Sequence, residues 1–307
     1  MMRLYMSVLC IGLSLGSSAL ALKLPNKTMK KTEFTPASNS LSSQDDFKGQ
    51  ENEYKELALH ARKNPEKINA LASEMVEDEN PAEKEEIKEY VASELRKEAL
   101  ARQYVLLIDK SASMGSYDKD GGVRGDRWGA AEKATKGLVD AMFKNDMDHK
   151  VPSYLFGHNV ETIGELTDSH QVMQLFKEHD PDGRNTNLSD ALSTALEDHI
   201  GMRRNNYEVV PGTTIVVITD GAPNSEDRVR TVLQKYANPE NGYIKNDEEL
   251  AITFIQIGDD EGARLFLKSM DKGWSFGGRK MDICDTKKDD DLRRMGPEKI
   301  LEEAIFD

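Results

Sequence analysis

The stretch from Tyr104 to Ser113 reads Tyr-Val-Leu-Leu-Ile-Asp-Lys-Ser-Ala-Ser and decides the architecture of this chain. Its first five residues form a short apolar run, which is typical of a strand buried on both faces of a parallel sheet. The run stops at Asp109, and Ser111 and Ser113 follow at alternate positions. Because alternate side chains of an extended segment point the same way, we expect one carboxylate and two hydroxyls to converge just past the strand.

A second stretch, residues 213–219, reads Thr-Thr-Ile-Val-Val-Ile-Thr and is followed by Asp220 and Gly221. If the two predicted strands are parallel neighbours, Asp109 and Asp220 lie at the carboxyl edge where open α/β sheets bind ligands. Two carboxylates that lie a few Å apart repel each other, and a cation between them turns the repulsion into attraction. A polar loop between the strands offers Thr186 as a further hydroxyl. Oxygen donors alone favour a hard divalent cation such as Mg²⁺.

Together these residues resemble the metal-ion-dependent adhesion site (MIDAS) of a von Willebrand factor type A domain. The resemblance covers residues 102–307 and rests on Asp109-x-Ser111-x-Ser113, a later loop Thr186, and Thr219-Asp220-Gly221. It implies that the three hydroxyls coordinate Mg²⁺ directly or through water, while the two carboxylates supply charge; Mn²⁺ and Ca²⁺ are alternatives. It also implies that a Glu or Asp carboxylate of a partner protein completes the octahedron. The last predicted strands of this chain also resemble those of stand-alone bacterial members of the family.

From Tyr104 onward, strand and helix patterns alternate, which predicts a doubly wound, mostly parallel central sheet with helices on both faces. Further strands are predicted at residues 151–157, 160–166, 251–257 and 280–284. Helices are predicted at residues 127–145, 169–178, 188–200, 226–236, 261–270 and 297–306. The second and third strands should form an antiparallel edge hairpin. Asp259 and Asp260 are expected to cap the helix that follows them.

Residues 1–21 have the features of a signal peptide: Arg3 gives a positive start, an apolar stretch follows, and small residues precede a cleavage site after Ala21. The apolar stretch is shorter than the roughly 20 residues of a membrane-spanning helix. An uncleaved anchor is the alternative. We therefore expect an exported protein, periplasmic or secreted, with no integral membrane span after cleavage.

Two segments precede the predicted domain. Residues 22–54 are polar and poor in hydrophobic side chains, which predicts a disordered linker. Residues 55–101 are expected to form a helical extension, because Asn-Pro pairs at positions 64–65 and 80–81 are helix start signals. The extension either packs on the neighbouring domain or serves as an arm that binds a partner or a second copy.

Composition excludes several functions. The net charge of −14 argues against sequence-independent nucleic-acid binding, which depends on neutralising phosphates. Cleavage would remove Cys10 and leave Cys284 alone, so an intrachain disulfide is excluded, and this thiol is expected to be buried. The six histidines lack the spacing of a zinc site.

The sequence contains no recognisable catalytic motif of the Gly-x-Ser-x-Gly or phosphate-loop type. The predicted function is therefore a non-enzymatic binding protein. The alternative is a Mg²⁺-dependent phosphate hydrolase that uses Asp109 as nucleophile. Such enzymes usually carry a second carboxylate two residues on, where this chain has Ser111, and Lys110 is expected to point away from the site. A third alternative is a structural subunit in which the metal only stiffens the loops.

Overall fold

The computed structural model describes residues 101–115, 126–146, 148–182, 185–201 and 212–306. The predicted signal peptide, the linker and the helical extension up to residue 100 lie outside the described residues. Within the part that is described, no helix has the length and apolar character needed to cross a bilayer.

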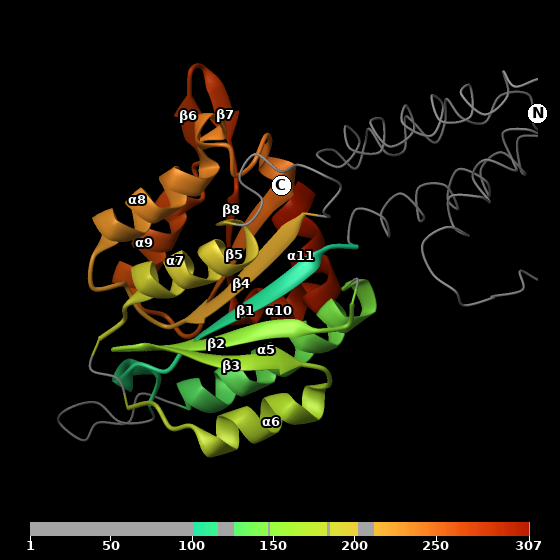
Figure 1. Cartoon of the computed structure of the whole chain (residues 1–307). Helices are drawn as coiled ribbons and strands as arrows, with labels where there is room; N and C mark the ends of the chain where they lie inside the picture. The colour runs from blue at the N-terminus through green and yellow to red at the C-terminus, as the bar shows by residue number, and fades with distance from the viewer. Residues whose placement is uncertain (1–100, 116–125, 147, 183–184, 202–211, 307) are drawn as a thin grey trace, which may run out of the picture. The chain divides into compact units, whose positions relative to one another are not determined.

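A six-stranded sheet forms the centre of the domain, with its strands in the order β3-β2-β1-β4-β5-β8 (Figure 1). Neighbouring strands are parallel except β2 and β3, which form the predicted antiparallel edge hairpin. The predicted α/β fold with a mostly parallel sheet is therefore confirmed. The strands of this sheet are β1 Gln103–Asp109, β2 Val151–Phe156, β3 Val160–Leu166, β4 Thr213–Thr219, β5 Leu250–Gln256 and β8 Cys284–Lys288.

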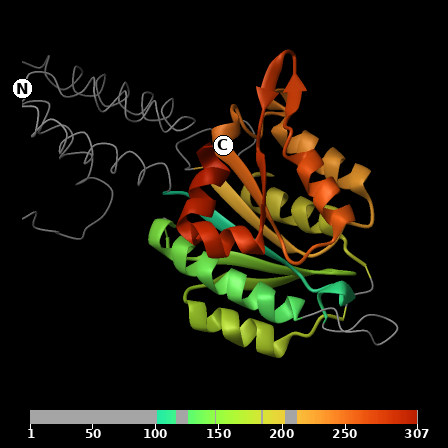
Figure 2. The same ribbon diagram turned by 180° about the vertical axis from the view of Figure 1, so that it is seen from behind.

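Helices cover both faces of the sheet, as Figures 1 and 2 show from opposite sides. One face carries α7 Leu188–His199, α8 Glu226–Ala237 and α9 Glu261–Met270, which pack on the side chains of Val105 and Leu107. The other face carries α5 Arg127–Asn145, α6 Ser169–Glu178, α10 Asp289–Met295 and α11 Pro297–Phe306, which pack on Leu106 and Ile108. Alternate residues of β1 thus enter two separate apolar cores, as expected for a strand covered on both faces.

The last part of the sheet differs from the prediction. The predicted strand at residues 280–284 is wrong: the sheet strand is β8, and residues before it form a separate hairpin of β6 Trp274–Phe276 and β7 Arg279–Met281. Gly277 and Gly278 have positive φ angles of 56° and 85°, which permit the tight hairpin turn. The edge strand β8 was missed because it is polar, with Lys287 paired to Asp285 and Glu303 rather than packed in a core. Cys284, its first residue, is buried as predicted.

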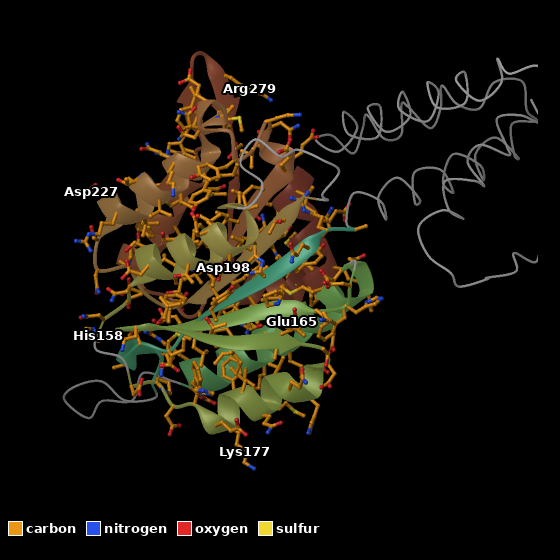
Figure 3. The ribbon with its side chains drawn as sticks, in the orientation of Figure 1. His158, Glu165, Lys177, Asp198, Asp227 and Arg279 are labelled. Carbon is orange, nitrogen blue, oxygen red and sulfur yellow. The ribbon has the colours of Figure 1, made fainter. Side chains whose placement is uncertain are left out.

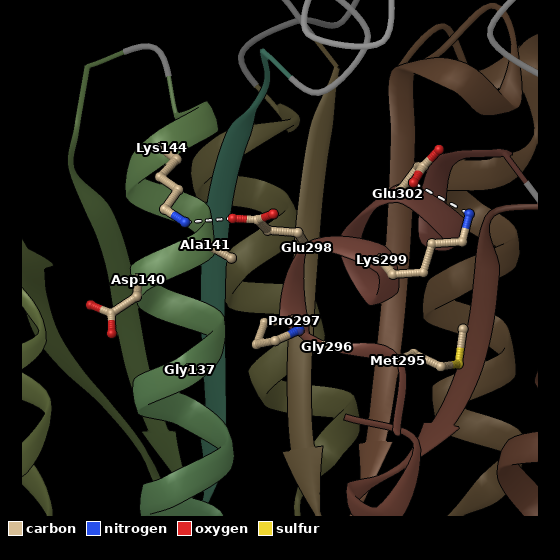
Figure 4. Close-up of a pocket in the computed structure, with 10 residues that line it drawn as sticks. All are labelled: Gly137, Asp140, Ala141, Lys144, Met295, Gly296, Pro297, Glu298, Lys299 and Glu302. Carbon is tan, nitrogen blue, oxygen red and sulfur yellow. Dashed lines mark hydrogen bonds and ion pairs between the residues drawn. The ribbon is translucent and has the colours of Figure 1, made fainter. Parts of the chain in front are cut away.

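The closing helix α11 packs on α5 and borders a pocket of about 370 Å³ on the helical face (Figure 4). Gly137 of α5 permits this approach, since a Cβ atom there would lie 3.2 Å from Cγ of Pro297. At the same pocket, Lys144 of α5 forms an ion pair with Glu298 of α11, 2.5 Å long and exposed to solvent. The pocket is lined by residues of α5, α10 and α11 and by Gly296 between the last two helices, and it contains none of the predicted site residues.

Candidate metal centre

Asp109 is the last residue of β1 and is completely buried. Its Oδ1 accepts a hydrogen bond of 2.8 Å from the backbone N–H of Ser111, and its Oδ2 accepts one of 2.6 Å from Oγ1 of Thr219. Thr219 ends β4, the parallel neighbour of β1. The pairing of these two strands therefore fixes the Asp109 carboxylate from both sides.

The two serines lie side by side, although the segment that carries them is not fully extended. Ser111 has extended backbone angles, but residues Ala112–Met114 form a single 3-10 turn. The turn brings Oγ of Ser111 and Oγ of Ser113 to 2.9 Å from each other. Ser113 Oγ then donates a hydrogen bond of 2.8 Å to Oδ1 of Asp220. The expected convergence thus occurs by a different route from the one the alternating pattern suggested.

Thr186 lies in the loop before α7, and this loop is tied to the segment that follows Asp220. The backbone N–H of Thr186 donates to Oδ1 of Asn224 at 3.1 Å, and the backbone N–H of Asn224 donates to the Thr186 carbonyl at 3.1 Å. The hydrogen bonds that connect the other four predicted site residues do not include the Thr186 hydroxyl. Asn224 was not predicted, because no motif marks an asparagine that bridges two distant loops.

Burial sets the charge state of the central carboxylate. Loss of solvation raises the pKa of Asp109 to about 7, despite the opposing hydrogen bonds from Ser111 and Thr219. The nearby carboxylate of Asp220 adds to the rise in pKa. The groups around Asp109 therefore compensate its negative charge only in part, which is the electrostatic environment that a bound cation relieves.

Arg127, the first residue of α5, is a further component of the site that sequence reasoning missed. Its Nη1 forms an ion pair and a hydrogen bond with Oδ2 of Asp220, whose side chain is completely buried. The same nitrogen lies 3.4 Å from the carbonyl oxygen of Ser113. Because 93 positions separate Arg127 from Asp220, no local pattern could have revealed the pair.

The residues present fit a hard divalent cation. Two carboxylates and two hydroxyls of the predicted set share one hydrogen-bonded cluster, and none of its members offers nitrogen or sulfur. Ser113 is only partly buried, so solvent and a ligand can reach the cluster from its side. Asp109, Ser111, Ser113 and Asp220 would hold such an ion, and the side of Ser113 is the side open to solvent.

Comparison with known protein families agrees with this fold. Residues 104–222 match the von Willebrand factor type A domain family. This match identifies a von Willebrand factor type A (VWA) domain within the chain. A search of curated proteins finds no match to it.

Several solved structures resemble this VWA domain protein at low identity. Manganese-loaded TRAP protein from Plasmodium vivax is 18% identical, with a TM-score of 0.42 over 67% of this chain and 74% of that chain. An aerotolerance-related membrane protein from Bacteroides fragilis is 17% identical, with a TM-score of 0.37 over 66% and 88%. BatB from Bacteroides thetaiotaomicron is 16% identical, with a TM-score of 0.41 over 66% and 98%.

The surroundings of Asp109 do not suit the hydrolytic alternative. A nucleophile must be reachable, but Asp109 is completely buried and both of its oxygens accept hydrogen bonds. Lys110 points away from the cluster as expected, since its Nζ pairs with Glu161 at 2.8 Å and Asp182 at 3.3 Å. VWA domains are in most cases binding modules rather than catalysts.

Proposed function

We propose that this VWA domain binds Mg²⁺ at a MIDAS and through it docks an acidic residue of a partner protein. The ion would be held by the five predicted residues: Asp109, Ser111, Ser113, Thr186 and Asp220. The observation that carries the proposal is the unbroken chain of hydrogen bonds from Thr219 through Asp109, Ser111 and Ser113 to Asp220. This chain joins both strand ends into one oxygen-rich cluster.

The residues of the cluster divide into two roles. The hydroxyls of Ser111, Ser113 and Thr186 are neutral, so they would hold the ion without cancelling its charge. The carboxylates of Asp109 and Asp220 would anchor it electrostatically. When bound, Mg²⁺ supplies a positive charge with an open coordination position that attracts a Glu or Asp carboxylate. The protein carries a net charge of −14, so this local positive charge allows an acidic partner to approach.

We also propose that the protein is exported to the periplasm or outside the cell, so that its partner would be found there. Support for this comes from the sequence of residues 1–21, with its positive start, apolar stretch and small-residue cleavage site. The helical extension would then lie between this leader and the VWA domain, available either to pack on the domain or to bind a second protein.

Capture of partner proteins from an exported fraction is expected to require both Mg²⁺ and the cluster. Proteins retained by the immobilised chain in Mg²⁺ should be lost in EDTA and should not bind the Asp220→Asn variant. A Lys144→Gln variant is the matched control, since its ion pair with Glu298 lies on the α5–α11 surface (Figure 4). Retention that survives EDTA would refute metal-mediated docking, and Mg²⁺-dependent release of phosphate from a model ester would favour the hydrolase.

Mg²⁺ affinity is expected to fall as the pH drops below about 7. The pKa of Asp109 is raised to about 7, so its carboxyl is protonated at lower pH, and Mg²⁺ must displace that proton. Displacement of one proton lowers the affinity about tenfold for each pH unit below 7. Above pH 7 the carboxyl is already ionised, and the affinity should be constant. Calorimetric titrations at about pH 5.5, 6.5 and 7.5 test this expectation.

The stability of the protein without metal should change with pH in the opposite direction. Since the pKa of Asp109 in the folded state lies above its unfolded value, its contribution to stability is present below about pH 4 and is lost as the pH rises toward 7. An Asp109→Asn variant cannot titrate at this position, so its stability without metal should lose this pH dependence. A wild-type Mg²⁺ affinity that stays constant from about pH 5.5 to 7.5 would show that no such proton is displaced.

A further inference from the structure

Both oxygens of the Asp220 carboxylate are already engaged by the chain. Oδ1 accepts the hydrogen bond of Ser113, and Oδ2 binds the guanidinium of Arg127. The side chain of Asp220 is 0% exposed, so no third direction is open to solvent. A cation that uses this carboxylate must therefore share it with these two groups.

The two groups differ in how well they tolerate a cation. The Ser113 hydroxyl can turn its lone pairs toward an ion while it keeps its bond to Asp220. The guanidinium has only donors and a permanent positive charge, so it repels a divalent ion beside the same carboxylate. Arg127 and a metal ion thus compete for Oδ2 of Asp220.

The side chain of Arg127 passes close to the backbone of Gly258. Gly258 follows β5 with a φ of +76°, and a Cβ atom there would lie 3.2 Å from Nε and 3.7 Å from Cζ of Arg127. The glycine therefore lets the guanidinium lie close to the backbone at the end of β5. Arg127 is also the first residue of α5, whose N-terminal cap is formed by the Asp126 side chain. Because its main chain belongs to this helix, a change of side-chain conformation is enough to take the guanidinium away from Asp220.

A cleft of about 470 Å³ next to Arg127 provides an alternative position for the side chain. Its lining is rich in carboxylates, contributed by Asp126, Asp259, Asp260, Glu261 and Asp289. Of these, Asp259 is 91% exposed and forms a 3.2 Å pair with Lys288. A guanidinium that leaves Asp220 would therefore turn into a negatively charged space beside its own helix end.

We propose that Arg127 is a tethered cation that competes with the metal ion for Asp220, and that Mg²⁺ binds by displacing its guanidinium into the acidic cleft. This inference rests on the proposed metal-binding function and assigns to Arg127 the setting of metal affinity. It makes the site selective as well: a divalent ion gains enough from two carboxylates to displace the guanidinium, and a monovalent ion gains less.

The test is calorimetric titration of Mg²⁺ into the wild-type chain and into the Arg127→Gln, Arg127→Lys and Arg264→Gln variants. Arg264→Gln is the matched control, because it removes the same charge near the same cleft, while its side chain pairs with Glu261 and not with Asp220. We expect Arg127→Gln to bind Mg²⁺ about tenfold more tightly than wild type, since a charge-assisted competitor is lost. Arg127→Lys keeps the charge but loses the planar guanidinium, so its Mg²⁺ affinity should lie between those of wild type and Arg127→Gln. Arg264→Gln should stay within about twofold of wild type.

Thermal unfolding gives a second readout. Without Mg²⁺, Arg127→Gln should have a lower Tm than wild type, because Asp220 loses its counter-charge, and saturating Mg²⁺ should close that gap. A purely structural role for Arg127 would instead lower the Tm and weaken Mg²⁺ binding together, which would overturn the inference. Equal affinity of wild type and both Arg127 variants would overturn it as well, while leaving the metal site in place. If neither wild type nor any variant binds Mg²⁺, the proposed function itself fails and the competition fails with it.

Discussion

Replacing Asp220 with asparagine is expected to weaken Mg²⁺ binding by at least about a hundredfold. Asparagine fills the same space and keeps an oxygen that can accept the Ser113 hydrogen bond, although it removes the charge that pairs with Arg127. It removes the negative charge that would anchor the ion, and the second carboxylate, Asp109, cannot replace it because it is fixed by Ser111 and Thr219. Calorimetric titration beside wild type and an Asp109→Ala variant, which should lose binding too, measures the effect.

The same variant should lose the stabilisation that the ion provides. Mg²⁺ at about a hundred times its dissociation constant should raise the free energy of unfolding of the wild type by roughly 2.7 kcal/mol. Asp220→Asn should show almost no gain at that concentration.

Asp182→Asn is the matched control for this prediction. It makes the same change of charge at the edge of the site, in a side chain that is 70% exposed and pairs with Lys110. Its Mg²⁺ affinity and its stabilisation should both match those of wild type. Wild-type affinity in Asp220→Asn would place the ion outside the predicted cluster, and the acidic cleft beside Arg127 would be the next region to test.

The sequence predicted those elements whose local pattern agrees with their tertiary surroundings. The strand at residues 213–219 and the helices at residues 261–270 and 297–306 were predicted with the observed bounds. The first is buried along its whole length, and the second is capped by Asp260, whose carboxylate accepts a hydrogen bond of 2.7 Å from the backbone N–H of Ala263. In these segments the residues that are buried or that cap the helix are close together in the sequence, so the local sequence pattern predicts the element.

What the sequence missed depends on contacts between distant segments. The polar strand β8 is stabilised by pairing with β5 and by the ion pairs of Lys287, not by an apolar face. At the site, the acidic and hydroxyl residues stand in a recognisable motif, whereas Arg127 and Asn224 do not. Arg127 and Asn224 reach the site through contacts with distant loops, and these loops come together only when the whole sheet has formed.

Truncation of Arg102 is expected to cause the largest loss of stability among single changes away from the site. The Arg102 side chain is 1% exposed at the start of β1. It donates from Nε to Oγ1 of Thr214 at 2.9 Å, from Nη1 to the Glu248 carbonyl at 2.7 Å, and from Nη2 to the Thr213 carbonyl at 3.2 Å. The Arg102 side chain thus connects β4 to the short turn that precedes β5.

Arg102→Ala removes three buried donors at once and leaves a cavity. The free energy of unfolding should therefore fall by about 3–5 kcal/mol, as measured by urea denaturation. Residue 212 beside the guanidinium cannot fill the cavity, because it is a glycine. In the wild type, a Cβ atom at Gly212 would lie only 2.3 Å from the Arg102 guanidinium.

Lys150→Ala is the matched control, because it truncates a cation whose 2.7 Å pair with Glu165 is exposed to solvent. Figure 3 labels Glu165, which belongs to the edge strand β3. That variant should lose less than about 1 kcal/mol. Equal losses in the two variants would show that Arg102 does not hold the strands together. Arg102 and the metal cluster lie at opposite ends of β1, so Arg102→Ala that remains folded should bind Mg²⁺ as wild type does. The stability of the sheet and the chemistry of its carboxyl edge can in this way be separated by experiment.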